Sequence, residues 1–157
     1  MSQENVEVVR LANEPHNGED MVPIMRQFIE SVPDWSDSDA VAAAIANDPN
    51  VRPMNPEVEW DATGLGMFGV VAHGLYGLAL FWREWVEAWE SYVYEMRRYR
   101  DLGDWVLTVG DARARGRGGI PVETRAFQLW RVQDGKIETV RLFASEAQDL
   151  KAVGVEE

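Results

Sequence analysis

Two residues of this chain combine a proton-transferring side chain with a position beside an apolar segment, which makes them candidate catalytic groups. Asp61 lies at the end of a predicted strand, and His73 comes directly before a predicted helix. A carboxylate or imidazole held away from water is able to remove a proton next to a carbonyl group. Tyr94 and Gln128 are candidate hydrogen-bond donors to the enolate oxygen that such a step creates. These residue types fit isomerase or cyclase chemistry by proton abstraction, without a metal.

Each of these residues also has a structural interpretation. Asp61 is equally suited to capping a loop or facing solvent, and His73 to hydrogen-bonding backbone groups at the start of a helix. Tyr94 fits an ordinary strand position, and His16, beside a predicted turn, is interpreted as structural. The sequence alone therefore leaves open whether the protein is an enzyme.

Aromatic and polar side chains of the predicted helix and strands are candidate ligand contacts. The chain has seven tryptophans in 157 residues, and aromatic ring faces suit planar apolar ligands. An arginine on a strand is a candidate partner for an anionic group of a ligand. The residues predicted to bind ligand are Trp60, Trp85, Tyr94, Arg125 and Gln128.

Composition excludes several classes of site and partner. The net charge of −12 disfavours nucleic acid and anionic membrane surfaces, and no apolar run is long enough to span a bilayer. With no cysteine and two distant histidines, we expect no metal. The spacing Gly64-x-Gly66-x-x-Gly69 resembles a dinucleotide fingerprint, but no helix begins at Gly69, so we expect no cofactor. The N-terminus has no signal-peptide pattern, which favours a cytoplasmic protein.

Hydrophobic periodicity predicts the elements that position these residues. Apolar residues at helical spacing predict helices over 2–13, 20–32, 37–47 and 75–89, and Ser145 begins a last helix that ends at Gly154. Alternation predicts a strand over 57–61 and four further strands over 92–100, 104–115, 121–132 and 136–144. The short turns between the last four strands permit only antiparallel neighbours.

This order of elements predicts one α+β domain over residues 1–157. Helices come first, then a strand, a long helix and an antiparallel meander, so the N-terminal helices pack on one face of a strongly curved, mostly antiparallel sheet. Such a sheet forms a cone. Where the helices do not fill the cone completely, an apolar pocket remains.

Several local strings resemble the SnoaL-like branch of the nuclear transport factor 2-like superfamily, which includes polyketide cyclases and is similar to ketosteroid isomerases. The matching strings are residues 1–10, 17–20 and 56–61, Gly74-x-x-Gly77 with 81–85, 127–130 with 134–137, and the closing segment to Gly154. Residues 31–55 depart from the family pattern as an inserted helical segment. The resemblance implies a conical pocket, and relatives with this fold often form homodimers through the sheet.

The leading hypothesis is a SnoaL-like pocket protein for a small hydrophobic molecule, a cyclic one among the candidates, with isomerase or cyclase chemistry as an open possibility. Asp61 or His73 would be the base. The competing hypothesis is a non-catalytic dimeric interaction or scaffold module whose cone is filled by its own side chains. A solvent-connected apolar cavity favours the first hypothesis, and a plugged cone favours the second.

Overall fold

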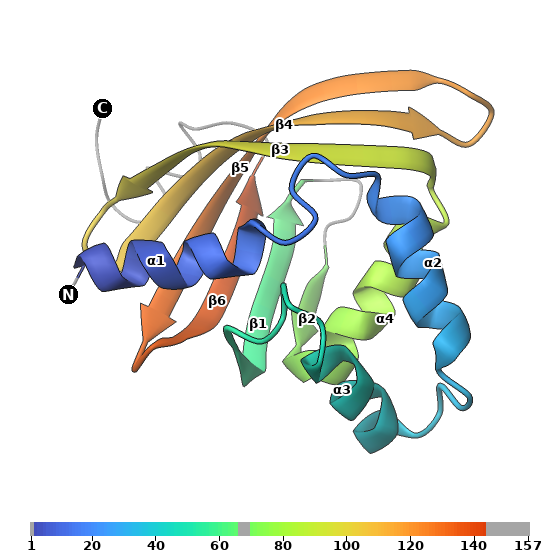
Figure 1. The fold of residues 1–157 in the computed structure, drawn as a ribbon, viewed down its shortest axis with the longest axis horizontal. Helices are drawn as coiled ribbons and strands as arrows, with labels where there is room; N and C mark the ends of the chain where they lie inside the picture. Colours follow the sequence, from blue (N-terminus) through green and yellow to red (C-terminus); the bar gives the residue numbers. More distant parts are fainter. Residues whose placement is uncertain (1, 66–69, 144–157) are drawn as a thin grey trace.

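The computed structural model describes residues 2–65 and 70–143, which form four helices and a six-stranded sheet (Figure 1). The helices are α1 (Ser2–Asn13), α2 (Met21–Ser31), α3 (Ser38–Ala46) and α4 (Gly74–Val86). The strands are β1 (Met54–Gly64), β2 (Val71–His73), β3 (Trp89–Asp101), β4 (Trp105–Gly116), β5 (Pro121–Gln133) and β6 (Lys136–Phe143).

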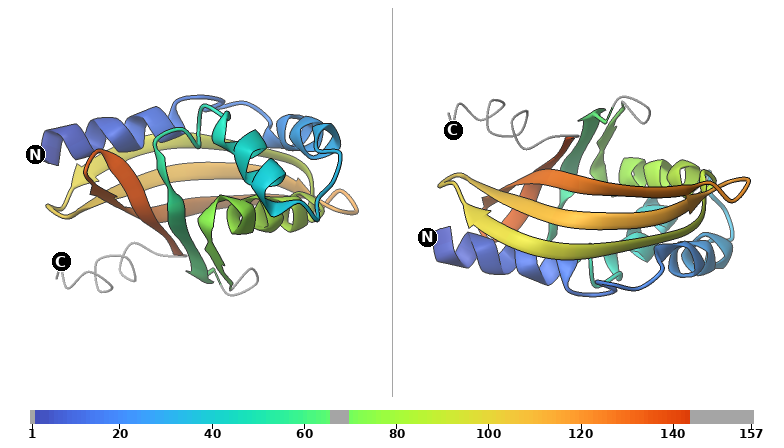
Figure 2. Two further views of the ribbon diagram at one scale, coloured as in Figure 1. Left: turned by 90° about the horizontal axis from the view of Figure 1, so that it is seen from below. Right: turned by 90° about the horizontal axis from the view of Figure 1, so that it is seen from above.

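The sheet is curved and open, and its strands lie in the order β2-β1-β6-β5-β4-β3. β1 pairs with β6 in parallel, and every other pair of neighbouring strands is antiparallel. The helices cover one face, whereas β3, β4 and β5 are in front when the molecule is viewed from the other side (Figure 2). We call the helix-covered side the inner face and the opposite side the outer face. The α+β class and the mostly antiparallel cone are confirmed.

Local sequence explains where the helices begin. Asp20 caps α2, because its carboxylate accepts a hydrogen bond from Val22 N at 3.1 Å. Asp37 caps α3 in the same way, with its carboxylate 3.1 Å from Ala40 N, and is the residue at which the helix predicted over 37–47 begins. α3 falls inside the segment 31–55 that was predicted to contain an inserted helix. The predicted helix that begins at Ser145 lies outside the described residues.

Two predicted boundaries are wrong in an informative way. The first strand begins at Met54, not at Glu57, because an extended backbone accommodates Pro56. The long helix ends at Val86, so Trp89 begins β3 and does not belong to the helix. Trp89 continues the helical spacing of Trp82 and Trp85 along the sequence only because the turn between α4 and β3 is short.

The link between α1 and α2 runs along the edge of β3. Asn17 Oδ1 accepts a hydrogen bond from Met96 N at 2.8 Å, Gly18 N donates to Tyr94 O at 2.9 Å, and Asp20 Oδ1 accepts from Tyr92 N at 3.0 Å. Gly18 has φ +80°, a left-handed conformation that favours glycine. We call residues 17–20 the edge strap.

The largest core cluster lies between the inner face and the helices. Val58, Ile137 and Val140 from the sheet and Leu78 from α4 are fully buried in it. No helix in the described part of the chain is long and apolar enough to cross a bilayer.

Candidate functional site

The inner face encloses a cavity of about 390 Å³ that α2, α4 and the strands surround. This volume falls in the usual range for small-molecule sites. Its lining residues are mostly apolar or aromatic: Met21, Met25, Trp60, Leu65, Phe81, Trp82, Trp85, Trp89, Tyr92, Tyr94, Ala112, Ala114, Val122, Thr124, Arg125, Ala126, Phe127, Gln128, Leu142 and Phe143. We call this space the large chamber. The cone is therefore not filled by its own described side chains.

Aromatic rings form two groups on the wall of the large chamber. The Trp60 ring lies edge-on to Trp82, with centroids 6.0 Å apart. At the C-terminal end of α4, Trp85 lies 4.6 Å from Tyr92, and Tyr92 lies 5.3 Å from Trp89. Edge-to-face packing holds such rings rigid, so they present preformed apolar surfaces to a ligand.

A smaller cavity of about 130 Å³ lies between α1, α2 and the segment after α3. Asp48 and Asn50 line it, and Asp48 Oδ1 accepts a hydrogen bond from Asn50 N at 2.8 Å. The Asn50 amide donates to Ala12 O and Pro15 O, while its Oδ1 is buried without a hydrogen-bond partner among the described residues. We call this space the small chamber. The two chambers share six lining residues: Met21, Met25, Trp60, Trp82, Tyr94 and Gln128.

A chain of neutral hydrogen bonds lies under the shared wall. Thr108 on β4 is fully buried, and its hydroxyl accepts a hydrogen bond from Trp130 Nε1 at 2.8 Å. The same hydroxyl donates to Gln128 Oε1 at 3.2 Å. Because Gln128 lines both chambers, this chain fixes the orientation of its amide toward a ligand.

Tyr94 reaches the shared wall because its ring crosses a glycine of β4, two positions before its paired residue Ala112. The Tyr94 ring lies across Gly110, where an added Cβ would overlap its ring and hydroxyl.

Burial raises the pKa of Tyr94, and the nearby Tyr92 adds to the effect, whereas a hydrogen bond with Thr108 opposes it. Burial raises the pKa of Tyr92 to about 12. Both tyrosines are therefore neutral donors at pH 7 and unsuited to act as bases.

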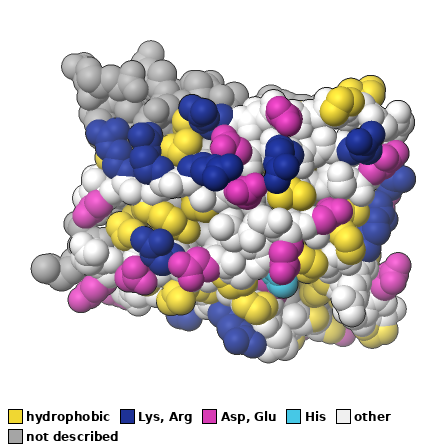
Figure 3. Space-filling view, turned by 45° about the horizontal axis from the view of Figure 1, so that its top comes forward, with side chains coloured by type: hydrophobic (Ala, Val, Ile, Leu, Met, Phe, Trp, Pro, Cys, Tyr) yellow, Lys and Arg dark blue, Asp and Glu magenta, His cyan; other side chains and the backbone are white. Residues whose placement is uncertain are grey.

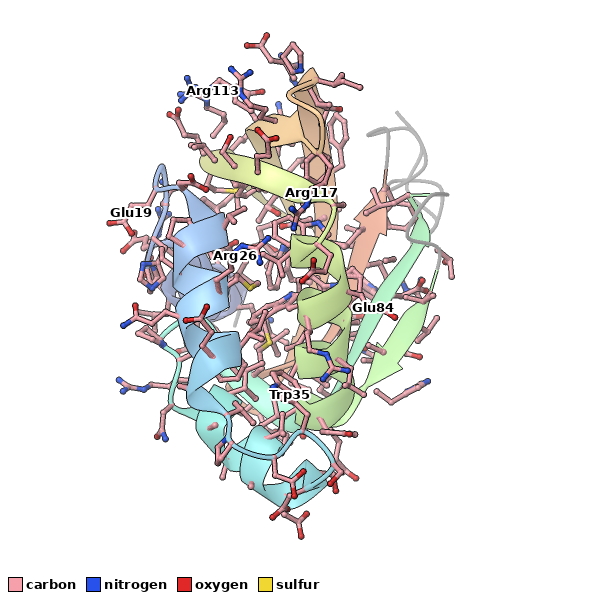
Figure 4. The ribbon with its side chains drawn as sticks, turned by 90° about the vertical axis from the view of Figure 1, so that its right-hand side faces the viewer. Glu19, Arg26, Trp35, Glu84, Arg113 and Arg117 are labelled. Carbon is pink, nitrogen blue, oxygen red and sulfur yellow. The ribbon has the colours of Figure 1, made fainter. Side chains whose placement is uncertain are left out.

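Ion pairs fasten the end of α4 that carries Trp85. The Glu87 carboxylate lies 3.9 Å from Arg26 on α2 and 3.2 Å from Arg117 in the β4–β5 turn. The Arg117 Nε donates to Glu87 O at 2.7 Å. Figure 4 shows Arg26 and Arg117 on neighbouring elements around this end of α4. These exposed ion pairs link α2, the end of α4 and the β4–β5 hairpin beside the large chamber.

Asp61 and His73 lie on the outer face. Trp60 is 8% exposed and faces the chambers, and the next residue in a strand points to the opposite side. Asp61 Oδ1 accepts hydrogen bonds from Thr63 N and Thr63 Oγ1, which is a local turn contact. His73 is exposed, and it lies opposite Glu59 in the antiparallel register of β1 and β2. Neither residue lines either chamber.

Arg125 lies at the rim of the large chamber and carries a mostly exposed side chain. Its Nε lies 3.6 Å from Asp111, which also pairs with Arg97 at 2.9 Å. Arg113 pairs with Glu95 at 2.9 Å nearby. Figure 3 shows basic and acidic side chains interspersed on this side of the molecule. Arg125 thus belongs to an outer charge network more than to the chamber wall.

Of the residues predicted to bind ligand, Trp60, Tyr94 and Gln128 meet on the shared wall and Trp85 lines the large chamber. Sequence reasoning missed Asp48, Asn50 and Thr108. Asp48 directly follows the helix predicted over 37–47 and precedes Pro49, a position typical of the end of a helix. Thr108 lies among apolar residues of its strand, where nothing in the sequence marks it as a buried hydrogen-bonding group.

Asp48 is the single carboxylate among the described residues that line either chamber. Three or more His, Asp or Glu side chains do not gather anywhere in the described ranges in a way that would hold a metal ion. The arrangement offers a ligand aromatic surfaces and neutral hydrogen-bonding groups.

Comparison with known proteins gives one family and a set of similar folds. The family described as SnoaL-like domain matches residues 26–140, more than half of the chain. No curated protein is significantly similar to the sequence.

Solved structures with a similar fold have low sequence identity. TerC, crystallised with polyporic acid, is 18% identical with a TM-score of 0.57, over 74% of this chain and 95% of that chain. A nuclear transport factor 2-like protein from Burkholderia thailandensis is 23% identical with a TM-score of 0.56, over 82% and 96%. A protein from Catenulispora acidiphila with a ketosteroid isomerase-like fold, in complex with trimethylamine, is 14% identical with a TM-score of 0.54, over 80% and 96%.

Proposed function

The chain belongs to the SnoaL-like domain family, and from this premise we propose that it binds a flat, hydrophobic, ring-containing small molecule in the large chamber. The observation that carries the proposal is an open cavity of about 390 Å³ lined by Trp60, Trp82, Trp85 and Trp89. Rigid aromatic walls favour planar apolar ligands over flexible ones, because less conformational freedom is lost on binding.

The wall chemistry supports binding more strongly than proton abstraction. An isomerase or cyclase step needs a base at the ligand, and Asp61 and His73 lie on the outer face. Asp48 lines the small chamber, but one of its carboxylate oxygens accepts a hydrogen bond from Asn50 N. If turnover occurs, Asp48 is the base to test, and Tyr94 is a neutral donor for a developing oxyanion.

The scaffold alternative requires a cone plugged by its own side chains, and the open large chamber argues against it.

Association through the outer face and a cytoplasmic location are further parts of the proposal. Half-buried Trp105 and Phe127 among the outer-face charges support association through the sheet. Light scattering of the purified protein checks the homodimer, and fractionation of cells that express the tagged chain checks the location.

The binding proposal is tested by titrating tryptophan fluorescence and melting temperature with steroid-like and aromatic polyketide-like compounds. A ligand that binds only the folded state raises the melting temperature and quenches the tryptophans of the wall. Flexible aliphatic compounds of matched carbon count should give much weaker responses. Flat responses to every ring compound would overturn the proposal.

A matched pair of variants locates the site. Ala114→Phe adds a ring inside the large chamber, whereas Arg115→Phe adds the same ring one residue further, on the outer face. We expect Ala114→Phe to weaken binding by about tenfold or more, equivalent to at least about 1.4 kcal/mol. Arg115→Phe should bind like the unmodified protein. Equal effects of the two variants would place the ligand elsewhere.

A further inference from the structure

Asp48 carries the single charge among the described residues that line the small chamber. The other residues of this wall are neutral, and no Lys, Arg or His of the described ranges joins them. One carboxylate oxygen of Asp48 accepts a hydrogen bond from Asn50 N at 2.8 Å. A carboxylate has room for several further donors on its two oxygens. The side chain is therefore able to accept hydrogen bonds from a ligand as well.

This carboxylate differs from the paired carboxylates elsewhere in the molecule. In the part of the chain that the structure describes, arginines pair with Glu87, Glu95 and Asp111, and no ion pair involves Asp48. Asp48 is half-buried, so part of its hydration is lost. A carboxylate removed from water is costly unless a cation or several donors compensate it. The small chamber thus presents a negative charge that no described cation balances.

Aromatic rings form much of the remaining wall of the small chamber. They belong to Phe28, Trp60, Trp82, Tyr94 and Trp130. The rings of Trp82 and Trp130 lie nearly at right angles to Trp60, with centroids 6.0 and 6.5 Å away. Ring faces carry a negative potential that attracts cations, and clusters of rings bind ammonium groups in proteins. The same wall would repel an anionic group.

The size of the small chamber suits one functional group of a larger ligand. Its volume of about 130 Å³ lies below the range of roughly 300–1,000 Å³ for whole drug-sized ligands. The small chamber adjoins the large chamber, with which it shares six lining residues. A ring in the large chamber needs only a short chain to carry a head group toward Asp48.

The charge around the helices also favours a cation. Residues 1–60, which include α1, α2 and α3, contain twelve Asp or Glu residues and three Arg. Such an excess of one sign raises the local concentration of the opposite charge and speeds its approach.

We propose that the small chamber binds an ammonium group, and that the ligand is a flat ring compound with a protonated amine on a short chain. Asp48 supplies the opposite charge, and the rings add cation–π attraction. This inference rests on the proposed function, because it places the ring of the ligand in the large chamber. It adds a charge requirement: the same ring with a neutral head group binds more weakly.

The test compares tryptamine with tryptophol, which carry the same indole ring and chain and end in an ammonium and a hydroxyl group. Their dissociation constants are measured by calorimetry on the full chain at pH 7. We expect tryptamine to bind about tenfold more tightly, the effect of about one charge-assisted hydrogen bond. Asp48→Asn keeps an oxygen for Asn50 N and removes the charge, so its preference for tryptamine should fall below about threefold.

Asp39→Asn is the matched control, because it removes the same charge from the exposed first turn of α3. Asp39 lines neither chamber, so this variant should keep the preference for tryptamine.

If Asp48→Asn does not fold, Phe28→Leu decides, because it removes a ring that lines only the small chamber. Its preference for tryptamine should fall about threefold, the effect of one lost cation–π contact. Trp85→Leu removes a ring of the large chamber and should weaken binding of both compounds alike. An unchanged preference in Phe28→Leu would then overturn the inference.

The outcomes separate this inference from the proposed function. Equal binding of tryptamine and tryptophol to the unmodified protein would overturn the ammonium inference and leave the proposed function standing. A preference that persists in Asp48→Asn, or that Asp39→Asn loses to the same extent, would also overturn it. If neither compound binds and steroid-like or polyketide-like rings do, the inference fails alone. If no ring compound binds, the proposed function fails as well.

Discussion

The two faces of the sheet are made by the same strands and differ sharply in chemistry. On the inner face, Trp60 and Gln128 line the chambers with an aromatic and a neutral polar group, and Thr108 is buried behind Gln128. On the outer face, arginines and carboxylates pair around a small apolar cluster in which Leu107 and Leu129 are fully buried. Successive residues of a strand point to opposite faces. A shift of the strand register by one residue would therefore place charged side chains at the chambers and ligand contacts at the surface.

The apolar cluster gives the outer face a core of its own, and Leu129→Ala tests it with the largest expected effect. Removing a fully buried leucine side chain should lower the free energy of unfolding by about 2–5 kcal/mol. Urea unfolding measures the change. Gln133→Ala, at the exposed end of the same strand, is the control and should cost less than about 0.5 kcal/mol. A small effect of Leu129→Ala would mean that only the inner face stabilises the fold.

The neutral tyrosines of the inner face predict a loss of stability at alkaline pH. The pKa of Tyr92 is raised from 10.0 to about 12, so its contribution is fully present below pH 10 and disappears as the pH rises toward 12. The loss should reach about 2 kcal/mol and should be smaller in Tyr92→Phe. Urea midpoints between pH 9 and 11.5 measure the slope.

Tyr76→Phe is the matched control for the alkaline measurement. Tyr76 lies on α4 and donates to Trp35 O at 2.8 Å, away from the chambers. Its removal should lower stability at every pH and keep the slope of the unmodified protein. An unchanged slope in Tyr92→Phe would contradict a buried neutral tyrosine at this wall.

Thr108→Val removes the acceptor of the Trp130 indole without changing the shape of the side chain. The buried N–H left behind should cost about 1–3 kcal/mol in unfolding free energy. Thr124→Val changes an exposed threonine at the rim and should cost almost nothing. The melting temperatures of the two variants, measured by thermal unfolding under the same conditions, compare their stabilities. Equal stability of the two variants would show that the hydrogen-bond chain adds nothing to the inner face.

The smallest effect is expected on the outer face, from Asp61→Asn and His73→Asn. Both side chains point away from the chambers, so ligand affinity should change less than about twofold, within the scatter of neutral surface substitutions. Asp48→Asn, in the small chamber, is the comparison. Loss of binding or turnover in Asp61→Asn or His73→Asn, with Asp48→Asn unaffected, would reverse the assignment of the faces.

Sequence periodicity predicted the elements well because helix and strand spacing repeat over many residues. The site was harder to predict, although one error was avoidable: Trp60 and Asp61 are adjacent in a strand and cannot both face one pocket. The same rule separates Gln128 from Arg125, three residues away. Parity within a strand therefore separates Trp60 from Asp61 and Gln128 from Arg125. The pairing of β1 with β6 and of β6 with β5 is needed to bring Trp60 and Gln128 to the same face.

Other parts of the site depend on contacts between distant segments. Gly110 makes room for Tyr94 only because β3 and β4 pair in one particular register. Asn50 lines the small chamber because its amide bonds to the end of α1, thirty-eight positions away. No local sequence pattern predicts the register of two strands or a hydrogen bond between residues so far apart in the chain. The predicted roles of the candidate residues in binding and catalysis are still to be tested by the variants above.

The edge strap has a consequence for how the protein meets other chains. β3 is the last strand of the sheet, and an unpaired edge offers backbone groups to which a foreign strand can add. Here Asn17, Gly18 and Asp20 already occupy the backbone of Tyr92, Tyr94 and Met96. The edge strap thus occupies the β3 edge over residues 92–96, so that a foreign strand cannot pair with the backbone of this part of the edge.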